Sequence, residues 1–440
     1  MSIVAEGYRQ EATFLSTVDS PPRDYRSVAL WSGITEAEWN DWRWQVANRI
    51  TTVDQLAQVI PLTPAEVEDI RECLRTFRMA VTPYYAGLID PLNPRCPVRM
   101  QAVPDRAEVD QGQEDLLDPL YEETDSPVPG ITHRYPDRVL FIVTDQCSMY
   151  CRHCTRRRLA GQTDRAPTRA ELNDRLDYVR QTTRVRDVVL SGGDALLVSD
   201  GLVEYLLKEL RAISHVEIIR LATRTPVVLP QRITPDLCRL IGRHHPVYVN
   251  THFNHPRELT PEAVAACERM ADAGIPLGNQ TVLLRGVNDC PVIMRRLVHG
   301  LLKARVRPYY LYQCDLSRGL QHFRTPTSRG VEIIEHLRGH TSGLAVPSYC
   351  IDGPGGVGKI PLGPQYVLAQ SPERIVLRNY EGAVAAYREP SGNGPQGDVC
   401  PTCGERHEEP ATGVAALLSG DALFLEPGNL ERAARRRALR

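Results

Sequence analysis

The sequence contains very little lysine. Of its 52 lysine and arginine residues, only Lys208, Lys303 and Lys359 are lysine. This bias fits genome composition better than a function, but it singles out each lysine that remains. Because the acidic residues number 54, the formal net charge is only −2. The sequence therefore offers no electrostatic basis for binding nucleic acid or an anionic membrane surface.

Long apolar segments are also missing. No run approaches the roughly 20 residues that a membrane-spanning helix needs. The first residues, Met1 to Phe14, lack a basic segment followed by an apolar one, so we expect no secretory signal and a cytoplasmic location. The hydrophobic fraction of 42% and the charged fraction of 24% are typical of a globular protein.

Cysteine is too sparse for a disulfide scaffold, with 12 residues in a chain of 440. Most of the cysteines have the spacing of a hydrophobic core. Cys73 and Cys267, for example, are expected to be buried, inert thiols on helices. Two groups differ from this pattern and need a chemical explanation: the triplet Cys147, Cys151 and Cys154, and the pair Cys400 and Cys403.

The N-terminal part is predicted to be helical from Glu36 to about Tyr85. Thr63-Pro64-Ala65-Glu66 forms a capping box with proline in the first turn, followed by apolar residues at helical spacing. Residues 90–130, rich in Pro, Asp and Glu, suggest an extended linker. We therefore divide the chain into a helical region with its linker (1–130), a central domain (131–370) and a C-terminal extension (371–440).

Strand-like and helix-like segments alternate through the central domain. Six main β-α repeats predict an α/β fold with a parallel sheet, in the form of a partial (β/α)6 TIM-like barrel. Polar and glycine-rich clusters follow the strands, at the end where such barrels carry their active sites. The expected strands are Val139–Val143, Val188–Leu190, Glu217–Leu221, Val247–Asn250, Leu277–Leu284 and Val306–Tyr312, with a further short run at Leu344–Ile351.

The cysteine triplet follows the first of these strands with the spacing C-x3-C-x2-C. Three thiolates on one tight loop can hold three irons of a [4Fe–4S] cluster and leave the fourth iron without a protein ligand. A zinc site is the alternative, but tetrahedral zinc requires four ligands and no fourth cysteine follows nearby. The triplet therefore favours an iron–sulfur cluster whose open iron can chelate a small molecule.

The segment Gly353–Lys359 matches the G-x4-G-K pattern of a phosphate-binding loop. Two features argue against a nucleotide site. Ile360 replaces the Ser or Thr that would bind Mg2+, and the prolines at 361 and 364 prevent the helix whose N-terminus would hold phosphate. The lysine instead suits chemistry that requires a primary amine, which arginine cannot supply.

The cysteine spacing is typical of the radical S-adenosylmethionine (SAM) superfamily, and longer segments resemble the lysine 2,3-aminomutase family from about residue 30 to 435. The resemblance implies a [4Fe–4S] cluster, SAM and pyridoxal 5′-phosphate as cofactors, with cleavage of SAM to an adenosyl radical at the open iron. The segments that carry it are 42–50, 125–129, 134–138, 147–158, 284–290 and 307–310.

The resemblance also assigns roles to individual residues. Lys359 would bind the pyridoxal phosphate aldehyde, and Arg134, Tyr135 and Arg138 would surround its ring and phosphate. The positions matching the SAM site are Ser191, Gly192, Gly193, Asp194, His252 and Gln280. The family pattern usually has alanine at position 353 and glycine at 357, where this chain has Gly353 and Val357, and this change should alter the flexibility of the loop.

The implied reaction is conversion of L-lysine to L-β-lysine by migration of the amino group from C2 to C3. Arg156 matches the residue that pairs with the substrate carboxylate, while Asp315 and Asp352 match those that hold the distal ammonium. Two converging carboxylates call for a cation between them, which argues against glutamate as the substrate. Arginine satisfies the same requirement, so arginine 2,3-aminomutase is the alternative.

Two more distant alternatives are the branch that modifies a lysine on elongation factor P and a non-catalytic iron–sulfur or zinc protein. Members of the first tend to be shorter and to lack the C-terminal extension, so the chain fits that branch poorly. The second predicts no pyridoxal absorbance and no cleavage of SAM.

The C-terminal extension departs from the family pattern. Pro395 and Gly397 stand where family members have cysteines, and Cys403 is additional. Cys290, Cys400 and Cys403, with His407 as a further candidate, could form a zinc site. The resemblance also implies a homodimer or homotetramer and an electron donor such as flavodoxin or ferredoxin.

Overall fold

The computed structural model describes residues 22–110, 112, 114–161, 166–371, 374–388 and 403–404. The chain divides into two compact units, residues 1–363 and 364–440. No helix among the described residues is long and apolar enough to cross a membrane.

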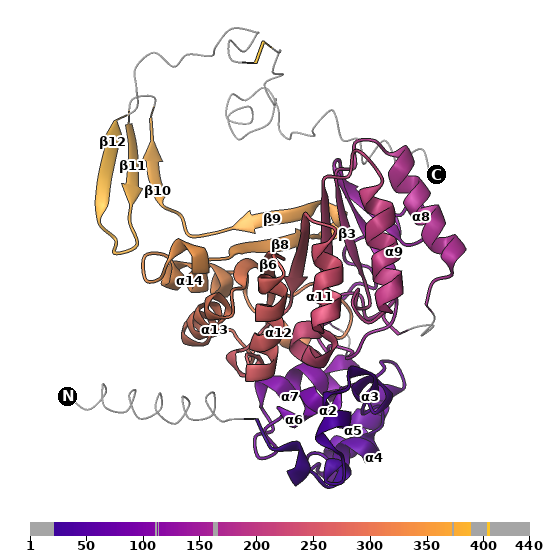
Figure 1. The fold of residues 1–440 in the computed structure, drawn as a ribbon. Helices are drawn as coiled ribbons and strands as arrows, with labels where there is room; N and C mark the ends of the chain where they lie inside the picture. The colour runs from indigo at the N-terminus through magenta and orange to yellow at the C-terminus, as the bar shows by residue number, and fades with distance from the viewer. Residues whose placement is uncertain are drawn as a thin grey trace, which may run out of the picture. The chain divides into compact units, whose positions relative to one another are not determined.

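The first unit begins with short helices (Figure 1). The predicted capping box is present: Thr63 Oγ1 accepts a hydrogen bond from Glu66 N at 3.2 Å, and the Glu66 carboxylate accepts one from Thr63 N at 2.8 Å. The predicted linker, however, is not extended throughout, because it contains α7 and a 3-10 turn at Arg106–Glu108. The helices are α2 (Glu36–Asn40), α3 (Trp42–Ala47), α4 (Val53–Ala57), α5 (Pro64–Leu74), α6 (Pro83–Gly87) and α7 (Pro97–Ala102).

Nine strands then form one sheet in sequence order. Strands β2 to β8 pair in parallel, while β1 and β9 are antiparallel to their neighbours at the two edges. The strands are β1 (Ile131–Tyr135), β2 (Arg138–Thr144), β3 (Asp187–Gly192), β4 (Ile218–Ala222), β5 (Val247–Thr251), β6 (Leu277–Leu283), β7 (Arg307–Gln313), β8 (Ser348–Gly353) and β9 (Gly358–Leu362).

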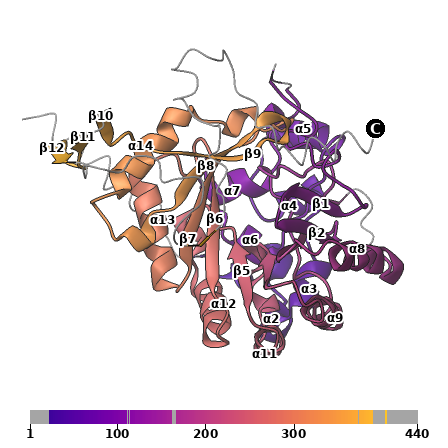
Figure 2. The ribbon, with the colours of Figure 1, turned by 90° about the horizontal axis from the view of Figure 1, so that it is seen from above.

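A helix follows each of the first six parallel strands, and these helices surround the curved sheet on the outside (Figure 2). The sheet stays open because β1 and β9 do not pair. The predicted partial (β/α)6 barrel is thus confirmed, with β8 as a seventh parallel strand. The helices are α8 (Arg169–Gln181), α9 (Asp200–Arg211), α11 (Pro235–Gly242), α12 (Pro261–Asp272), α13 (Pro291–Lys303) and α14 (Thr327–Leu337), and the short α10 (Thr225–Val228) precedes α11.

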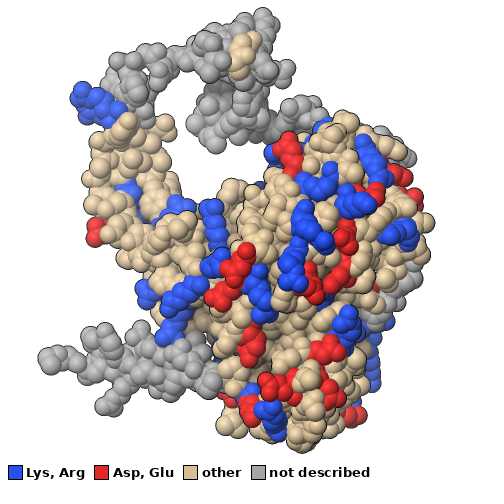
Figure 3. Space-filling view, in the orientation of Figure 1, with Lys and Arg blue, Asp and Glu red and all other residues tan. Residues whose placement is uncertain are grey.

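A continuous hydrophobic core joins the sheet to both sets of helices. It includes Cys267 at 1% exposure, as the helical spacing predicted, while Cys73 is fully buried on α5. On the outer surface, charges of both signs are interspersed (Figure 3). The Arg180–Glu209 ion pair at 2.5 Å, between α8 and α9, is typical of this surface.

The second unit contains an antiparallel sheet that the sequence pattern did not predict. Its strands are β10 (Val367–Gln370), β11 (Arg374–Arg378) and β12 (Val384–Arg388). The expected basic helix at 431–440 lies outside the described residues.

Candidate active site

One cavity of about 700 Å3 lies at the carboxyl ends of the barrel strands. Every site residue predicted from the sequence, apart from the zinc ligands, lines it. The sheet explains this gathering, since parallel strands all end at the same edge. The predicted residues that line the cavity are Arg134, Tyr135, Arg138, Cys147, Cys151, Cys154, Arg156, Ser191, Gly192, Gly193, Asp194, His252, Gln280, Asp315, Asp352 and Lys359.

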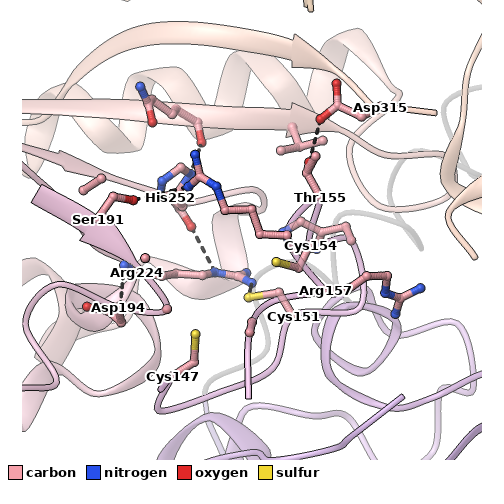
Figure 4. A pocket seen from close by; sticks show the side chains of 18 of the residues that line it. Cys147, Cys151, Cys154, Thr155, Arg157, Ser191, Asp194, Arg224, His252 and Asp315 are labelled. Carbon is pink, nitrogen blue, oxygen red and sulfur yellow. Dashed lines mark hydrogen bonds between the residues drawn. The ribbon is translucent and has the colours of Figure 1, made fainter. Parts of the chain in front are cut away.

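The three cysteines lie on the loop that follows β2, and their sulfur atoms face the same space (Figure 4). Burial raises the pKa of the Cys154 thiol to about 11, and burial also raises the pKa of the Cys147 thiol well above its usual range. Such burial disfavours the thiolate form, and a bound cationic metal centre would favour it. Within the described residues, no three His, Cys, Asp or Glu side chains are grouped to hold a single metal ion. Three free cysteines that line one cavity fit a cluster, which distributes its ligands over several irons.

Hydrogen bonds from the N-terminal helical region hold the cysteine loop. Arg152 N donates to the Gln101 carbonyl at 2.9 Å, and Arg49 Nη1 donates to the Cys147 carbonyl at 2.6 Å. The Arg152 guanidinium is buried and pairs with the fully buried Glu108 at 2.5 Å. Burial alone would raise the pKa of Glu108, but the charges of Arg152 and Arg157 outweigh it and lower that pKa. The predicted linker thus supplies a buried carboxylate that anchors the loop.

The Gly192-Gly193 turn brings β3 against the start of the cysteine loop. A Cβ atom at Gly192 would lie 2.2 Å from the Thr144 carbonyl oxygen, and one at Gly193 would lie 2.1 Å from that of Gln146. The Asp194 carboxylate accepts hydrogen bonds from Thr223 Oγ1 at 2.5 Å and from Arg224 N at 2.8 Å. These contacts hold the turn beside the cysteines, so that the backbone of Gly192 and Gly193 forms part of the cavity wall.

His252, directly after β5, lies beside Gln280 on β6. His252 Nδ1 donates to the Gln280 carbonyl at 3.0 Å, and the Gln280 side chain donates to the Tyr312 hydroxyl at 3.3 Å. Burial and the nearby Arg224 charge lower the pKa of His252 to about 4. His252 is therefore neutral at physiological pH and can accept a hydrogen bond through Nε2.

Lys359 lies on β9, directly opposite Asp352 on β8. Its Nζ is 3.2 Å from Asp352 Oδ1 and 5.1 Å from the centre of the Tyr312 ring, and 31% of the side chain is exposed. Strand β9 follows the glycine loop, at the place where a nucleotide-binding loop would be followed by a helix. A primary amine that reaches an open cavity fits the requirement for bonding an aldehyde.

The β1–β2 hairpin supplies the residues expected near pyridoxal phosphate. Tyr135 Oη accepts a hydrogen bond from Lys359 N at 3.0 Å, and the Arg138 guanidinium lies 5.0 Å from the Tyr135 ring centre. Arg138 also pairs with Asp137 at 2.9 Å, and Arg134 pairs with Asp125 at 3.1 Å. The hairpin therefore places Tyr135 at the base of Lys359 and Arg138 beside the Tyr135 ring, while Arg134 lines the same cavity. Two arginines and an aromatic ring suit an aromatic phosphate ester.

Asp315 follows β7 and faces the same part of the cavity as Asp352. Thr155 Oγ1, next to the last cysteine, donates to Asp315 Oδ2 at 2.5 Å (Figure 4). Burial, and to a smaller extent the negative charge of Asp352, raise the pKa of Asp315 to about 6. Two carboxylates so arranged favour a ligand that brings a cation between them.

Arg156 already has an acidic partner. Glu122 accepts hydrogen bonds from Arg156 Nη2 at 2.7 Å and from Nε at 2.9 Å, while Arg156 Nη1 lies 3.3 Å from Ser191 Oγ. Burial alone would raise the pKa of Glu122, but the charges of Arg156 and Arg158 outweigh it and lower that pKa. One edge of the guanidinium is thus fixed, and the Nη1 end is directed toward the cavity wall that carries Ser191.

Four residues of the site had no predicted role: Glu122, Thr155, Arg224 and Tyr312. Thr155 lies in a segment that carries the family resemblance, and Tyr312 ends the predicted strand Val306–Tyr312, so their neighbourhood was recognisable. Glu122 lies in the predicted linker, and Arg224 in a polar cluster after β4. No local pattern distinguishes either from surface residues.

The predicted zinc site is not tested by the structure. Cys290 occupies the N-cap position of α13 in the first unit without a capping side-chain hydrogen bond, and Cys403 is an exposed residue of the second. Cys400 and His407 lie outside the described residues. Zinc binding therefore remains a prediction.

Comparison with known proteins identifies the family of the chain. A family profile described as lysine-2,3-aminomutase matches residues 334–440, and one for the radical SAM superfamily matches residues 141–297. L-lysine 2,3-aminomutase of Clostridium subterminale is 57% identical over 92% of this chain and 98% of its own length. The Bacillus subtilis protein of the same name is 52% identical over 95% and 90%.

A glutamate 2,3-aminomutase of Clostridioides difficile is 48% identical over 82% of this chain and 85% of its own length. Among solved structures, a radical SAM methyltransferase from Sphaerobacter thermophilus gives a TM-score of 0.38 at 17% identity, over 52% of this chain and 69% of that one, and the assignment does not depend on it. High identity over nearly the full length of the lysine 2,3-aminomutases places this chain in the lysine 2,3-aminomutase family of the radical SAM superfamily.

Proposed function

We propose that the protein converts L-lysine to L-β-lysine by moving the amino group from C2 to C3. The observation that carries the proposal is the single cavity that contains the cysteine triplet, the amine of Lys359 and two carboxylates. No simpler binding function requires all three in one place. A non-catalytic iron–sulfur protein would need neither the lysine nor the acidic pair.

Each cofactor of the family has residues that suit it. Cys147, Cys151 and Cys154 would hold the cluster, and Lys359 would bind pyridoxal phosphate. When bound, the cluster and SAM supply a carbon radical that abstracts hydrogen, and pyridoxal phosphate supplies a conjugated ring that stabilises the substrate radical. The protein supplies position and exclusion of water.

The residues on the wall beside SAM have separate tasks. Gly192 and Gly193, which approach the cysteine loop closely, would border the methionyl part of SAM together with Ser191 and Asp194. Neutral His252 offers an acceptor, and Gln280 an amide, to the adenosyl part. None of these groups carries a net positive charge that would repel the sulfonium.

The substrate is fixed at both ends. Arg156, oriented by Glu122, would hold the α-carboxylate, because a guanidinium pairs with a carboxylate through parallel hydrogen bonds. Asp315 and Asp352 would hold the distal ammonium, and the 3.2 Å contact between Lys359 Nζ and Asp352 supports this role because it already brings an amine nitrogen to one of the two carboxylates. A glutamate side chain would meet two carboxylates and be repelled.

A competition experiment tests the proposal. The protein is reconstituted without oxygen with iron, sulfide, pyridoxal phosphate, SAM and dithionite, and receives equal amounts of L-lysine, L-arginine and L-glutamate. Mass spectrometry then counts the β-isomers. β-Lysine as the main product supports the proposal, while mainly β-arginine would assign the same acidic pair to a guanidinium and replace lysine as the substrate.

Further parts of the proposal concern partners and location. We propose that a flavodoxin or ferredoxin reduces the cluster and that the chain forms a homodimer or homotetramer.

We also propose a cytoplasmic location, since thiol ligands suit a reducing compartment. We further propose that Cys290, Cys400 and Cys403 bind a zinc ion. Light scattering tests the assembly, and metal analysis of Cys290→Ser and Cys403→Ser tests the zinc.

A further inference from the structure

Arg224 connects the end of strand β4 to the cysteine loop. Its guanidinium extends along the floor of the cavity toward Cys151 (Figure 4), and Nη1 donates to Cys151 Sγ at 2.8 Å. The side chain is 8% exposed. A buried positive charge therefore touches the sulfur of a proposed cluster ligand.

The other nitrogen atoms of the guanidinium have partners that fix its orientation. Arg224 Nη2 donates to Gln101 Oε1 at 2.6 Å and to Glu258 Oε1 at 2.7 Å. Its Nε donates to the His252 carbonyl at 3.2 Å. Since these acceptors come from α7 and from the connection between β5 and α12, the guanidinium cannot turn without breaking several buried hydrogen bonds. Nη1 is consequently held at Cys151.

The charge of Glu258 does not cancel the effect at the sulfur. Glu258 Oε2 accepts hydrogen bonds from Asn254 N at 2.6 Å and from His255 N at 2.9 Å, and Oε1 accepts one from Tyr85 Oη at 2.7 Å. The carboxylate is fully buried, these donors stabilise its charge, and it contacts Nη2 of Arg224 rather than the Nη1 that reaches Cys151. The guanidinium thus interacts with a carboxylate through one nitrogen and with a sulfur through another.

We infer that Arg224 is a positioning residue for the iron–sulfur cluster and that its N–H to Cys151 raises the reduction potential of that cluster. Hydrogen bonds to ligand sulfurs and nearby positive charge stabilise the reduced cluster, which carries one more electron. The inference rests on the proposed function because it requires Cys151 to be a cluster ligand. It adds that a residue outside the cysteine motif sets how readily the cluster accepts its electron.

The test is a potentiometric titration of the full-length protein, reconstituted without oxygen and followed by electron paramagnetic resonance without lysine. Arg224→Gln removes the charge, and Arg224→Lys keeps the charge but cannot reach all four acceptors. The matched control is Arg232→Gln. Arg232 is also buried but donates to the carbonyls of Leu196 and Val198, each at 2.9 Å, and it makes no hydrogen bond to a cysteine within the described part of the chain.

At the wild-type midpoint potential, Arg224→Gln should show a reduced-to-oxidised ratio at least about tenfold lower, which for one electron is a midpoint about 59 mV more negative. Arg224→Lys should shift in the same direction by less, and Arg232→Gln should match the wild type. If Arg224→Gln holds no iron, the shift in Arg224→Lys decides.

Equal potentials in the wild type, the decisive Arg224 variant and the control would overturn the inference while leaving the proposed function intact. A wild-type protein that assembles no [4Fe–4S] cluster would instead contradict the proposed function. Because the titration needs no substrate, the two failures are distinguishable.

Discussion

The two ends of the cavity are built in different ways. At the cysteine end, buried charged groups from distant segments fix the site: Glu108 with Arg152, Glu258 with Arg224, and Asp194 with its hydroxyl donors. At the lysine end, a single β-hairpin carries Lys359 and Asp352, and both side chains remain partly exposed. The first design suits a cluster that must stay fixed. The second suits groups that must accept and release a substrate.

The largest expected effect is at the cysteine end. Cys151→Ala should abolish β-lysine formation and sharply lower the iron content, because the cluster loses one of three protein ligands. Cys267→Ala, on the buried face of α12, should retain iron and activity. Iron analysis and product assay after the same reconstitution compare the two. Normal iron content and normal activity in Cys151→Ala would show that this loop does not bind the cluster.

At the lysine end, Lys359→Ala should also abolish β-lysine formation but leave the iron content unchanged. The amine that bonds the cofactor aldehyde is lost, while the cysteine loop is untouched. The visible absorption of lysine-bound pyridoxal phosphate should disappear. Lys359→Arg keeps the charge opposite Asp352 and should fail equally, and any substantial activity in it would contradict the role of a primary amine.

Asp315→Asn should raise KM for lysine about thirtyfold or more, because truncating one partner of a buried charge pair costs about 2–5 kcal/mol. The pKa of Asp315 is about 6, so in the wild type the carboxylate is protonated and loses its attraction for ammonium as the pH falls through 6. KM should therefore rise on acidification in the wild type. Initial rates across this pH range should show no such rise of KM in Asp315→Asn. A parallel rise of KM in both proteins would exclude Asp315 as the group that causes it.

Glu122→Gln should have a smaller effect, raising KM for lysine about tenfold with little change in kcat. The variant loses the charge that orients Arg156, which corresponds to roughly 1.4 kcal/mol of binding free energy. Glu123→Gln is the matched control, since the Glu123 side chain is 76% exposed and pairs with Arg158 instead. Equal KM values in the two variants would separate Glu122 from substrate binding.

The smallest effect concerns the loop before Lys359. A Cβ at Gly353 would lie 2.2 Å from Val357 Cγ2, so Gly353→Ala should lower the free energy of unfolding by about 1–3 kcal/mol through overcrowding. Adding Val357→Gly removes the obstacle and should recover part of the loss. Denaturant unfolding of the single and double variants measures this coupling, and purely additive effects would show that the two positions are independent.

The comparison of the two ends also shows what the sequence could predict. The Cys147–Cys154 loop and the Gly353–Lys359 loop are local motifs, and their residues could be assigned before the fold was known. The alternation of strand-like and helical segments likewise predicted the barrel. Glu122 and Arg224 could not be assigned, since their roles depend on pairing with residues 34 and 73 positions away. The prediction of an extended linker at residues 90–130 was wrong in part. An acidic composition is found in solvated segments and also in segments whose carboxylates pair with buried arginines, so composition alone could not distinguish the two.

The most direct test of the central claim follows the migrating nitrogen. The reconstituted protein receives L-lysine that carries 15N in the α-amino group alone, and mass spectrometry with fragmentation locates the label in the product. The account predicts β-lysine with the 15N on C3. Absence of β-lysine, or β-lysine whose amino group at C3 is unlabelled, would contradict it.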